Sequence, residues 1–137
     1  MMEIDKEQIA LLLQKRYNYI REIGRLTDEI AEAFSRQDEV SAEMLLNMRG
    51  DEMVKADSCN EELLRMGEEN AEKHRLIRRL LSSDTAEKPD ENDYWETKIY
   101  EIRIKTSKAL EKIRIADRSM NRRVAGSRSC YADDLRK

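Results

Sequence analysis

The sequence has very little glycine and proline, with four glycines and one proline in 137 residues. Sheets and tight turns depend on these residues, so their scarcity argues against a strand-rich fold. Aromatic residues are also few, at 5% of the chain. The core must therefore consist of Leu, Ile, Met and Ala, which suits thin helical bundles better than thick layered domains. The sequence predicts an all-helical protein of a single domain.

Paired cysteines, a strong excess of one charge and long apolar runs are lacking as well. Cys59 and Cys130 are far apart and have the spacing of neither a disulfide framework nor a zinc site, which favours a reducing cytoplasm. The net charge of −3 gives no general case for nucleic acid as a partner. No apolar run approaches the roughly 20 residues of a membrane span, and residues 1–7 are largely charged. We expect a cytoplasmic protein with no membrane span.

Motifs of catalysis and of metal binding are not found. The chain has no nucleophile beside a base, no His-x-x-x-His and no glycine-rich loop. The single histidine, His74, stands between Lys73 and Arg75 without a second ligand nearby and is interpreted as a surface residue. We therefore expect no enzymatic activity, no cofactor and no metal site.

Helical periodicity is what the chain has in abundance. The expected domain, residues 1–126, has helices at about 4–34, 38–81 and 94–125 and a linker at 82–93, followed by a flexible tail at 127–137. The second stretch either continues to Leu81 or restarts after a break, because residues 67–73 are polar. Asp38 is the expected N-cap of the second helix, Asn92 or Asp93 of the last, and Gly126 its C-terminal stop. These features predict an elongated antiparallel bundle or coiled coil of three long helices.

The apolar positions of the second stretch are rich in methionine and do not keep to one line. Unbranched Met side chains fill irregular gaps between packed helices and also suit adaptable binding surfaces. We interpret them as core filler, with a binding face as the alternative.

The last stretch has a narrow apolar seam that begins at Trp95 and recurs in steps of four and three residues. Such a seam suits contact with other helices. The candidate partner-binding residues are Ile99, Ile102, Ala109, Leu110, Ile113, Ala116, Met120 and Val124. Burial inside the protein's own bundle is the alternative for the first half of this helix, whereas Met120 and Val124 have little to cover them. Its many basic residues favour pairing with acidic helices of the same bundle or of a protein partner over nucleic acid.

Residues 4–16 and 22–26 resemble the first helix of the all-helical chorismate mutases, and Arg16 matches a substrate-binding arginine of that family. The lysine that the family pattern places three residues after Gly24 is replaced by Thr27, which would remove the positive partner of the substrate's ether oxygen. We take this resemblance as coincidental and interpret Arg16 as a side chain whose stem follows the seam while its guanidinium stays in water.

A second resemblance covers more of the chain. Residues 26–34, the charged break at Asp38, and residues 42–46 and 49–53 are similar to the flagellar type III export chaperones of the FlgN and FliT kind. The resemblance implies a cytoplasmic chaperone that binds the C-terminal helical segment of a hook–filament junction or related flagellar subunit by helix-in-groove contacts. The alternative is a structural coiled-coil adaptor without chaperone activity. The partner's identity and the oligomeric state, monomeric or self-associated, stay open.

Overall fold

A computed structural model of the chain describes residues 5–81 and 92–136, with side chains described as far as Arg122. These residues form four helices and no strand: α1 (Lys6–Ser35), α2 (Glu39–Gly67), α3 (Ala71–Leu81) and α4 (Tyr94–Arg136). The prediction of an all-helical protein is confirmed. None of the helices in the described ranges combines the length and the apolar character needed to cross a membrane.

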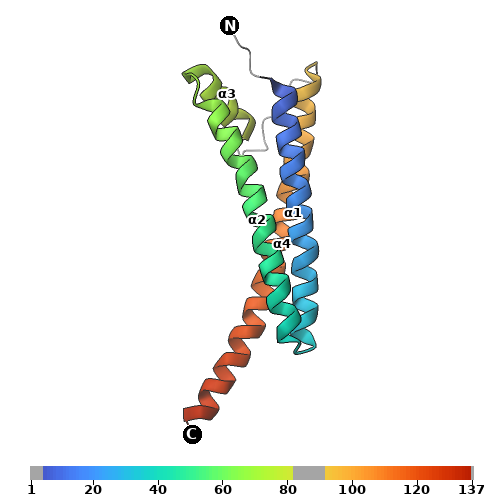
Figure 1. Cartoon of the computed structure of the whole chain (residues 1–137), viewed down its shortest axis with the longest axis vertical. Coiled ribbons are helices and arrows are strands. Elements are labelled where there is room, and N and C mark those ends of the chain that lie inside the picture. Colours follow the sequence, from blue (N-terminus) through green and yellow to red (C-terminus); the bar gives the residue numbers. More distant parts are fainter. Residues whose placement is uncertain (1–4, 82–91, 137) are drawn as a thin grey trace.

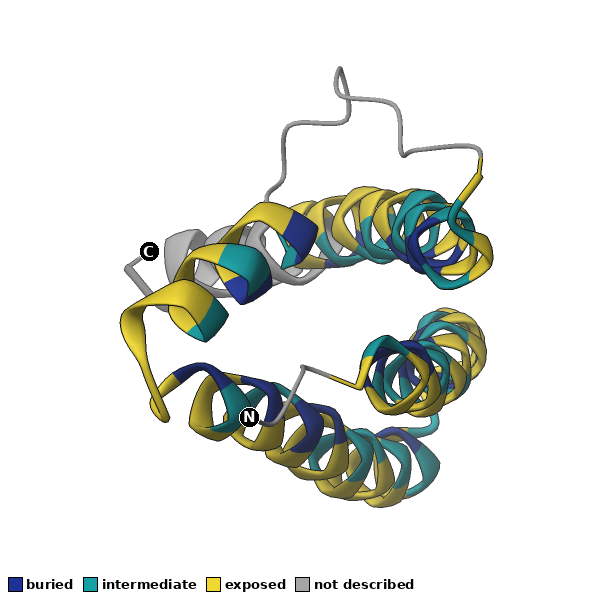
Figure 2. Ribbon diagram, turned by 90° about the horizontal axis from the view of Figure 1, so that it is seen from above, coloured by how far each residue is buried: buried dark blue, intermediate teal, exposed yellow. Residues whose placement is uncertain are grey.

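The bundle is built around α1 (Figure 1). Helix α2 returns antiparallel to α1, and α4 runs in the same direction as α1. Helix α1 packs against both α2 and α4, whereas the backbones of α2 and α4 do not come close to each other. The short α3 folds back at the end of α2 and reaches α4, so that the gap between α2 and α4 is bridged at that end (Figure 2).

A side-chain oxygen caps the N-terminus of each of the four helices. Asp5 accepts a hydrogen bond from the backbone N–H of Gln8 at 3.2 Å, and Asp38 accepts one from Ser41 at 3.1 Å. Asn70 does the same for Lys73 at 2.8 Å. Asp93 accepts from Trp95 and Glu96 at 3.1 and 3.2 Å. These bonds satisfy N–H groups that the first helical turn leaves without partners. The predicted cap at Asp38 is confirmed, and Asp93 is the capping residue of the last helix.

The connection between α1 and α2 is a tight turn. Gln37 has a φ of 59°, in the left-handed region. Its N–H donates to the Phe34 carbonyl at 3.0 Å, and the N–H of Asp38 donates to the Ala33 carbonyl at 2.9 Å. This pair of bonds is the Schellman motif, in which glycine usually takes the left-handed position. Residues 35–38, which the sequence leaves open between turn and kink, thus reverse the chain.

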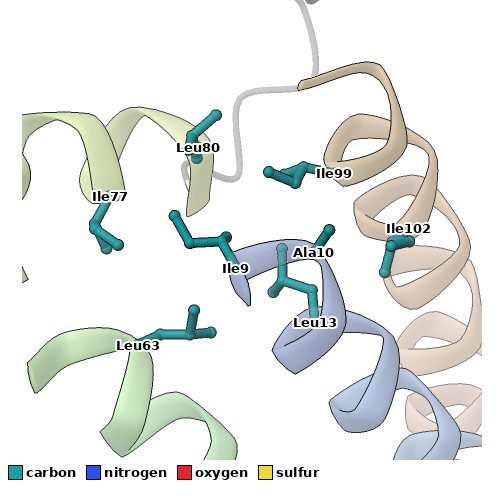
Figure 3. Close-up of a cluster of buried hydrophobic side chains, with 8 residues drawn as sticks. All are labelled: Ile9, Ala10, Leu13, Leu63, Ile77, Leu80, Ile99 and Ile102. Atoms are coloured by element: carbon teal, nitrogen blue, oxygen red, sulfur yellow. The ribbon is translucent and has the colours of Figure 1, made fainter. Parts of the chain in front are cut away.

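A cluster of buried apolar side chains lies where all four helices meet (Figure 3). Its buried members are Ile9, Ala10 and Leu13 of α1, Leu63 of α2, Ile77 and Leu80 of α3, and Ile99 and Ile102 of α4.

Ion pairs also connect the helices at this end of the bundle. Glu96 is buried beside Lys6 at 3.5 Å and is also paired with Arg79, so one carboxylate joins α1, α3 and α4. Lys6 Nζ lies 2.6 Å from Asp93 Oδ2.

One helix boundary differs from that expected, and the sequence had left another open. Of the two alternatives for the second helical stretch, the restart is the one observed, because the stretch ends at Gly67 and begins again as α3 at Ala71. Gly67 lies close to α3, because a Cβ there would be in ordinary van der Waals contact, 3.5 Å from the His74 Cα and 3.6 Å from the Ile77 side chain. Helix α4 continues through Gly126 to Arg136, where we expected it to stop. A helix tolerates an internal glycine at a cost of about 1 kcal/mol. Linker residues 82–91 lie outside the described residues.

Candidate protein-binding surfaces

The predicted partner-binding residues of α4 divide into two groups. Ile99, Ile102 and Met120 are at least nine-tenths buried inside the bundle, so they are not accessible to a partner in this conformation. The other group is partly exposed and consists of Ala109, Leu110, Ile113 and Ala116. The Val124 side chain lies outside those described. Whether any of these residues contacts a partner stays a prediction.

Three members of the second group line a groove between α1 and α4. Its floor contains Gly24 of α1 and the small or branched residues Ala109, Ile113 and Ala116 of α4. Gly24 and Ile113 meet there, because a Cβ at position 24 would lie 3.6 Å from Ile113 Cγ1. The cavity has a volume of about 410 Å³. The remaining lining residues are Tyr17, Ile20, Arg21, Thr27, Asp28, Lys105, Lys108 and Lys112. We call this cavity the lysine groove.

The rim of the lysine groove is strongly positive. Lys105, Lys108 and Lys112 come from α4, Arg21 from α1, and Asp28 is the only carboxylate among the lining residues. Within the described part of the chain, none of the four cations lies within ion-pair distance of a carboxylate. The expected pairing of the basic last helix with acidic neighbours is thus not found at these lysines. A site with this charge attracts anions.

One ion pair crosses the gap between α2 and α4. Arg49 of α2 donates from one guanidinium nitrogen to Asp117 Oδ1 of α4 at 2.7 Å and to Thr27 Oγ1 of α1 at 3.1 Å. Thr27 is fully buried and donates its own hydroxyl to the Ile23 carbonyl at 2.7 Å. Sequence reasoning missed this contact and considered Thr27 as the replacement of a lysine. We call these three residues the arginine clamp.

The second surface is an exposed apolar face on α2. Seven of the eleven large apolar side chains that are exposed in the described residues belong to this helix. Val40, Met44 and Met48 follow one another at intervals of four residues, and Val54 comes fourteen residues after Val40, so the four lie on one side of α2. They are 80, 58, 42 and 65% exposed. The buried side of α2 carries Ala42, Ala56, Cys59 and Leu63 instead. We call the four exposed residues the methionine face. The interpretation of the α2 methionines as core filler is wrong for Met44, Met48 and Met53.

Two further groups attract attention because burial shifts their pKa values. Arg16 is half-buried, its Nε has no hydrogen-bond partner, and desolvation lowers the pKa of its guanidinium. The expectation that this group stays fully in water is therefore wrong. Burial also raises the pKa of the Cys59 thiol, which keeps it protonated and poorly reactive. Among the described residues, no three His, Cys, Asp or Glu side chains gather in a way that could hold a metal ion.

Fold and surfaces together define an elongated helical bundle with one exposed apolar face and one cationic groove. Comparisons with protein-family models, with curated proteins and with solved structures each give no match to this chain.

Proposed function

We propose that the protein is a helix-binding chaperone of the flagellar export kind. It works in the cytoplasm and covers the amphipathic C-terminal helical segment of a hook–filament junction or related flagellar subunit until that subunit is exported. The resemblance of residues 26–53 to this family suggests the class of partner. The observation that carries the proposal is the methionine face, because it supplies an apolar docking surface that the bundle does not use for itself.

The residue types of this face suit the task. Methionine side chains are unbranched and polarizable, so they can adapt to several partner helices. A helix with apolar residues on more than one side requires more than one neighbour, and in this structure α2 has its main contact with α1. A partner helix laid along Val40, Met44, Met48 and Val54 would complete the packing of α2. Ordering of that partner costs several kcal/mol, which keeps the complex releasable.

The experiment is thermal unfolding with and without a synthetic peptide of the junction subunit's C-terminal segment. A ligand at one hundred times its Kd stabilises by about 2.7 kcal/mol, which raises the Tm of a chain of this size by roughly 5–10 °C. Met44→Gln/Met48→Gln should reduce that shift. The matched control is Leu11→Gln/Leu64→Gln, which removes two apolar side chains outside the methionine face that are at least as exposed as Met44 and Met48.

The adaptor alternative makes the opposite forecast. A structural coiled-coil protein satisfies its exposed seams by stable self-association, so the foreign peptide would leave the Tm unchanged even at large excess. An unchanged Tm, or an equal loss of the shift in both double variants, would contradict binding at the methionine face.

A further inference from the structure

The lysine groove is a second surface, which lies between α1 and α4. It is cationic, whereas the methionine face on α2 is apolar. Lys105, Lys108 and Lys112 are spaced by three and four residues, so they follow one side of α4 over about 10 Å. Arg21 supplies a positive charge from α1, and its guanidinium lies 5.9 Å from the centre of the Tyr17 ring. The groove therefore has cations on both of its walls.

The floor between these walls is apolar and low. Ala109 and Ala116 have short side chains, so another backbone can approach α4 closely at this point, whereas Gly24 lies against Ile113. Ile20 and Ile113 add apolar surface beside them. An opening of about 410 Å³ accommodates several small side chains of an approaching element. A purely electrostatic site for a free anion has no need of such a floor.

We propose that the lysine groove docks an acidic amphipathic helix of a protein partner. The helix would place small apolar residues on the floor and Asp or Glu residues along its two edges. Carboxylates one helical turn apart match the spacing of Lys105, Lys108 and Lys112, because residues three and four apart lie on one side of a helix. The three lysines have no carboxylate partner among the described residues, so the bundle itself leaves these charges to an incoming group. This site is independent of the methionine face.

The test is binding of a designed 21-residue helix with Glu on both edges of an alanine and leucine stripe, followed by fluorescence anisotropy with the full chain. A peptide with Gln in place of each Glu is the first control. Lys105→Gln/Lys108→Gln/Lys112→Gln should weaken binding of the Glu peptide at least about tenfold, since each lost charge contact contributes a factor of a few. Lys98→Gln/Arg114→Gln/Arg118→Gln removes as many cations from α4 outside the groove and should change binding less than about twofold.

A variant that keeps every charge tests the floor. Ala109→Leu/Ala116→Leu fills the groove and should weaken helix binding strongly, while the salt dependence of the remaining binding stays unchanged. Equal weakening by the two triple variants, or undiminished binding of the Gln peptide, would overturn the proposal.

Two other occupants are distinguished by the same set of proteins. Tighter binding of a 20-base-pair DNA duplex than of the Glu peptide, lost in the groove variant, would make the groove a general polyanion site and overturn the proposal. A native chain that sediments as a dimer, together with a Lys105→Gln/Lys108→Gln/Lys112→Gln variant that sediments as a monomer, would assign the groove to a second copy of the chain. That result would also overturn the proposal.

Discussion

Substitutions of Asp117 and of Arg49, the two charged members of the arginine clamp, should lower the free energy of unfolding by unequal amounts. Asp117→Ala removes the carboxylate and leaves the Arg49 guanidinium, whose side chain is only 16% exposed, with the Thr27 hydroxyl as its remaining partner. Arg49→Met removes the charge itself and replaces it with an apolar chain of similar length. Leaving a partly buried charge without its partner lowers the free energy of unfolding more than removing both charges of the pair does.

The size of the effect follows from the geometry. The Arg49–Asp117 bond is short, charge-assisted and partly shielded, with side chains 16 and 30% exposed. Such bonds contribute about 1–2 kcal/mol. We expect Asp117→Ala to lower the free energy of unfolding by this amount and the Tm by roughly 3–8 °C. Arg49→Met should cost less than 1 kcal/mol, and the double variant should resemble Arg49→Met.

The assay is urea unfolding monitored by circular dichroism at 222 nm, with the fluorescence of the single tryptophan, Trp95, as a second probe. Coincident transitions of the two probes would validate the comparison of free energies. A double-variant cycle then gives the coupling between Arg49 and Asp117. The reasoning is refuted if Arg49→Met is the more damaging change, or if the coupling is within about 0.3 kcal/mol of zero.

Two other predictions concern the turn and the end of the bundle near α3. Gln37→Gly should stabilise the protein by about 1 kcal/mol in the same urea assay, because a non-glycine residue pays roughly that much for the left-handed conformation; a destabilised variant would contradict the Schellman turn. The hydrogen bond from Lys6 holds the pKa of Asp93 below its usual range, so this pair stabilises the fold above about pH 4 and the gain disappears as the pH falls through the folded-state pKa. Asp93→Asn can still cap α4, so it should be less stable than the native chain at pH 7 and equally stable near pH 2. A difference in the free energy of unfolding that persists near pH 2 would contradict this linkage.

Much of the fold is readable in the sequence because its signals are local. Asp38 and Asp93 stand just before periodic apolar segments, and capping depends only on such neighbours. The buried positions Ile99 and Ile102 belong to a seam that the spacing identifies. A helix period specifies which residues share a side, however, and not which other helix covers that side. This is why the exposure of Met44 and Met48 could not be inferred.

The candidate surfaces depend on register between helices, which the sequence does not encode locally. Lys105, Lys108 and Lys112 could find carboxylates only if an acidic helix lay beside them, and in the structure α1 presents Arg21 and Asp28 at that level. The clamp is equally distant in sequence, since Arg49 and Asp117 come from separate helices. The early end assigned to the last helix had a different cause, because the glycine rule at helix ends is a tendency that neighbouring residues can override.

The position of α1 as a shared wall has a consequence for how this protein can change. The backbones of α2 and α4 each pack against α1 and not against one another, and the methionine face and the lysine groove share no residue. A substitution in one of these surfaces should therefore leave the other unchanged. Selection can then adjust the two surfaces separately. A replacement of Thr27 would affect both sides of α1, because this buried residue accepts a hydrogen bond from Arg49 of α2 and also lines the lysine groove.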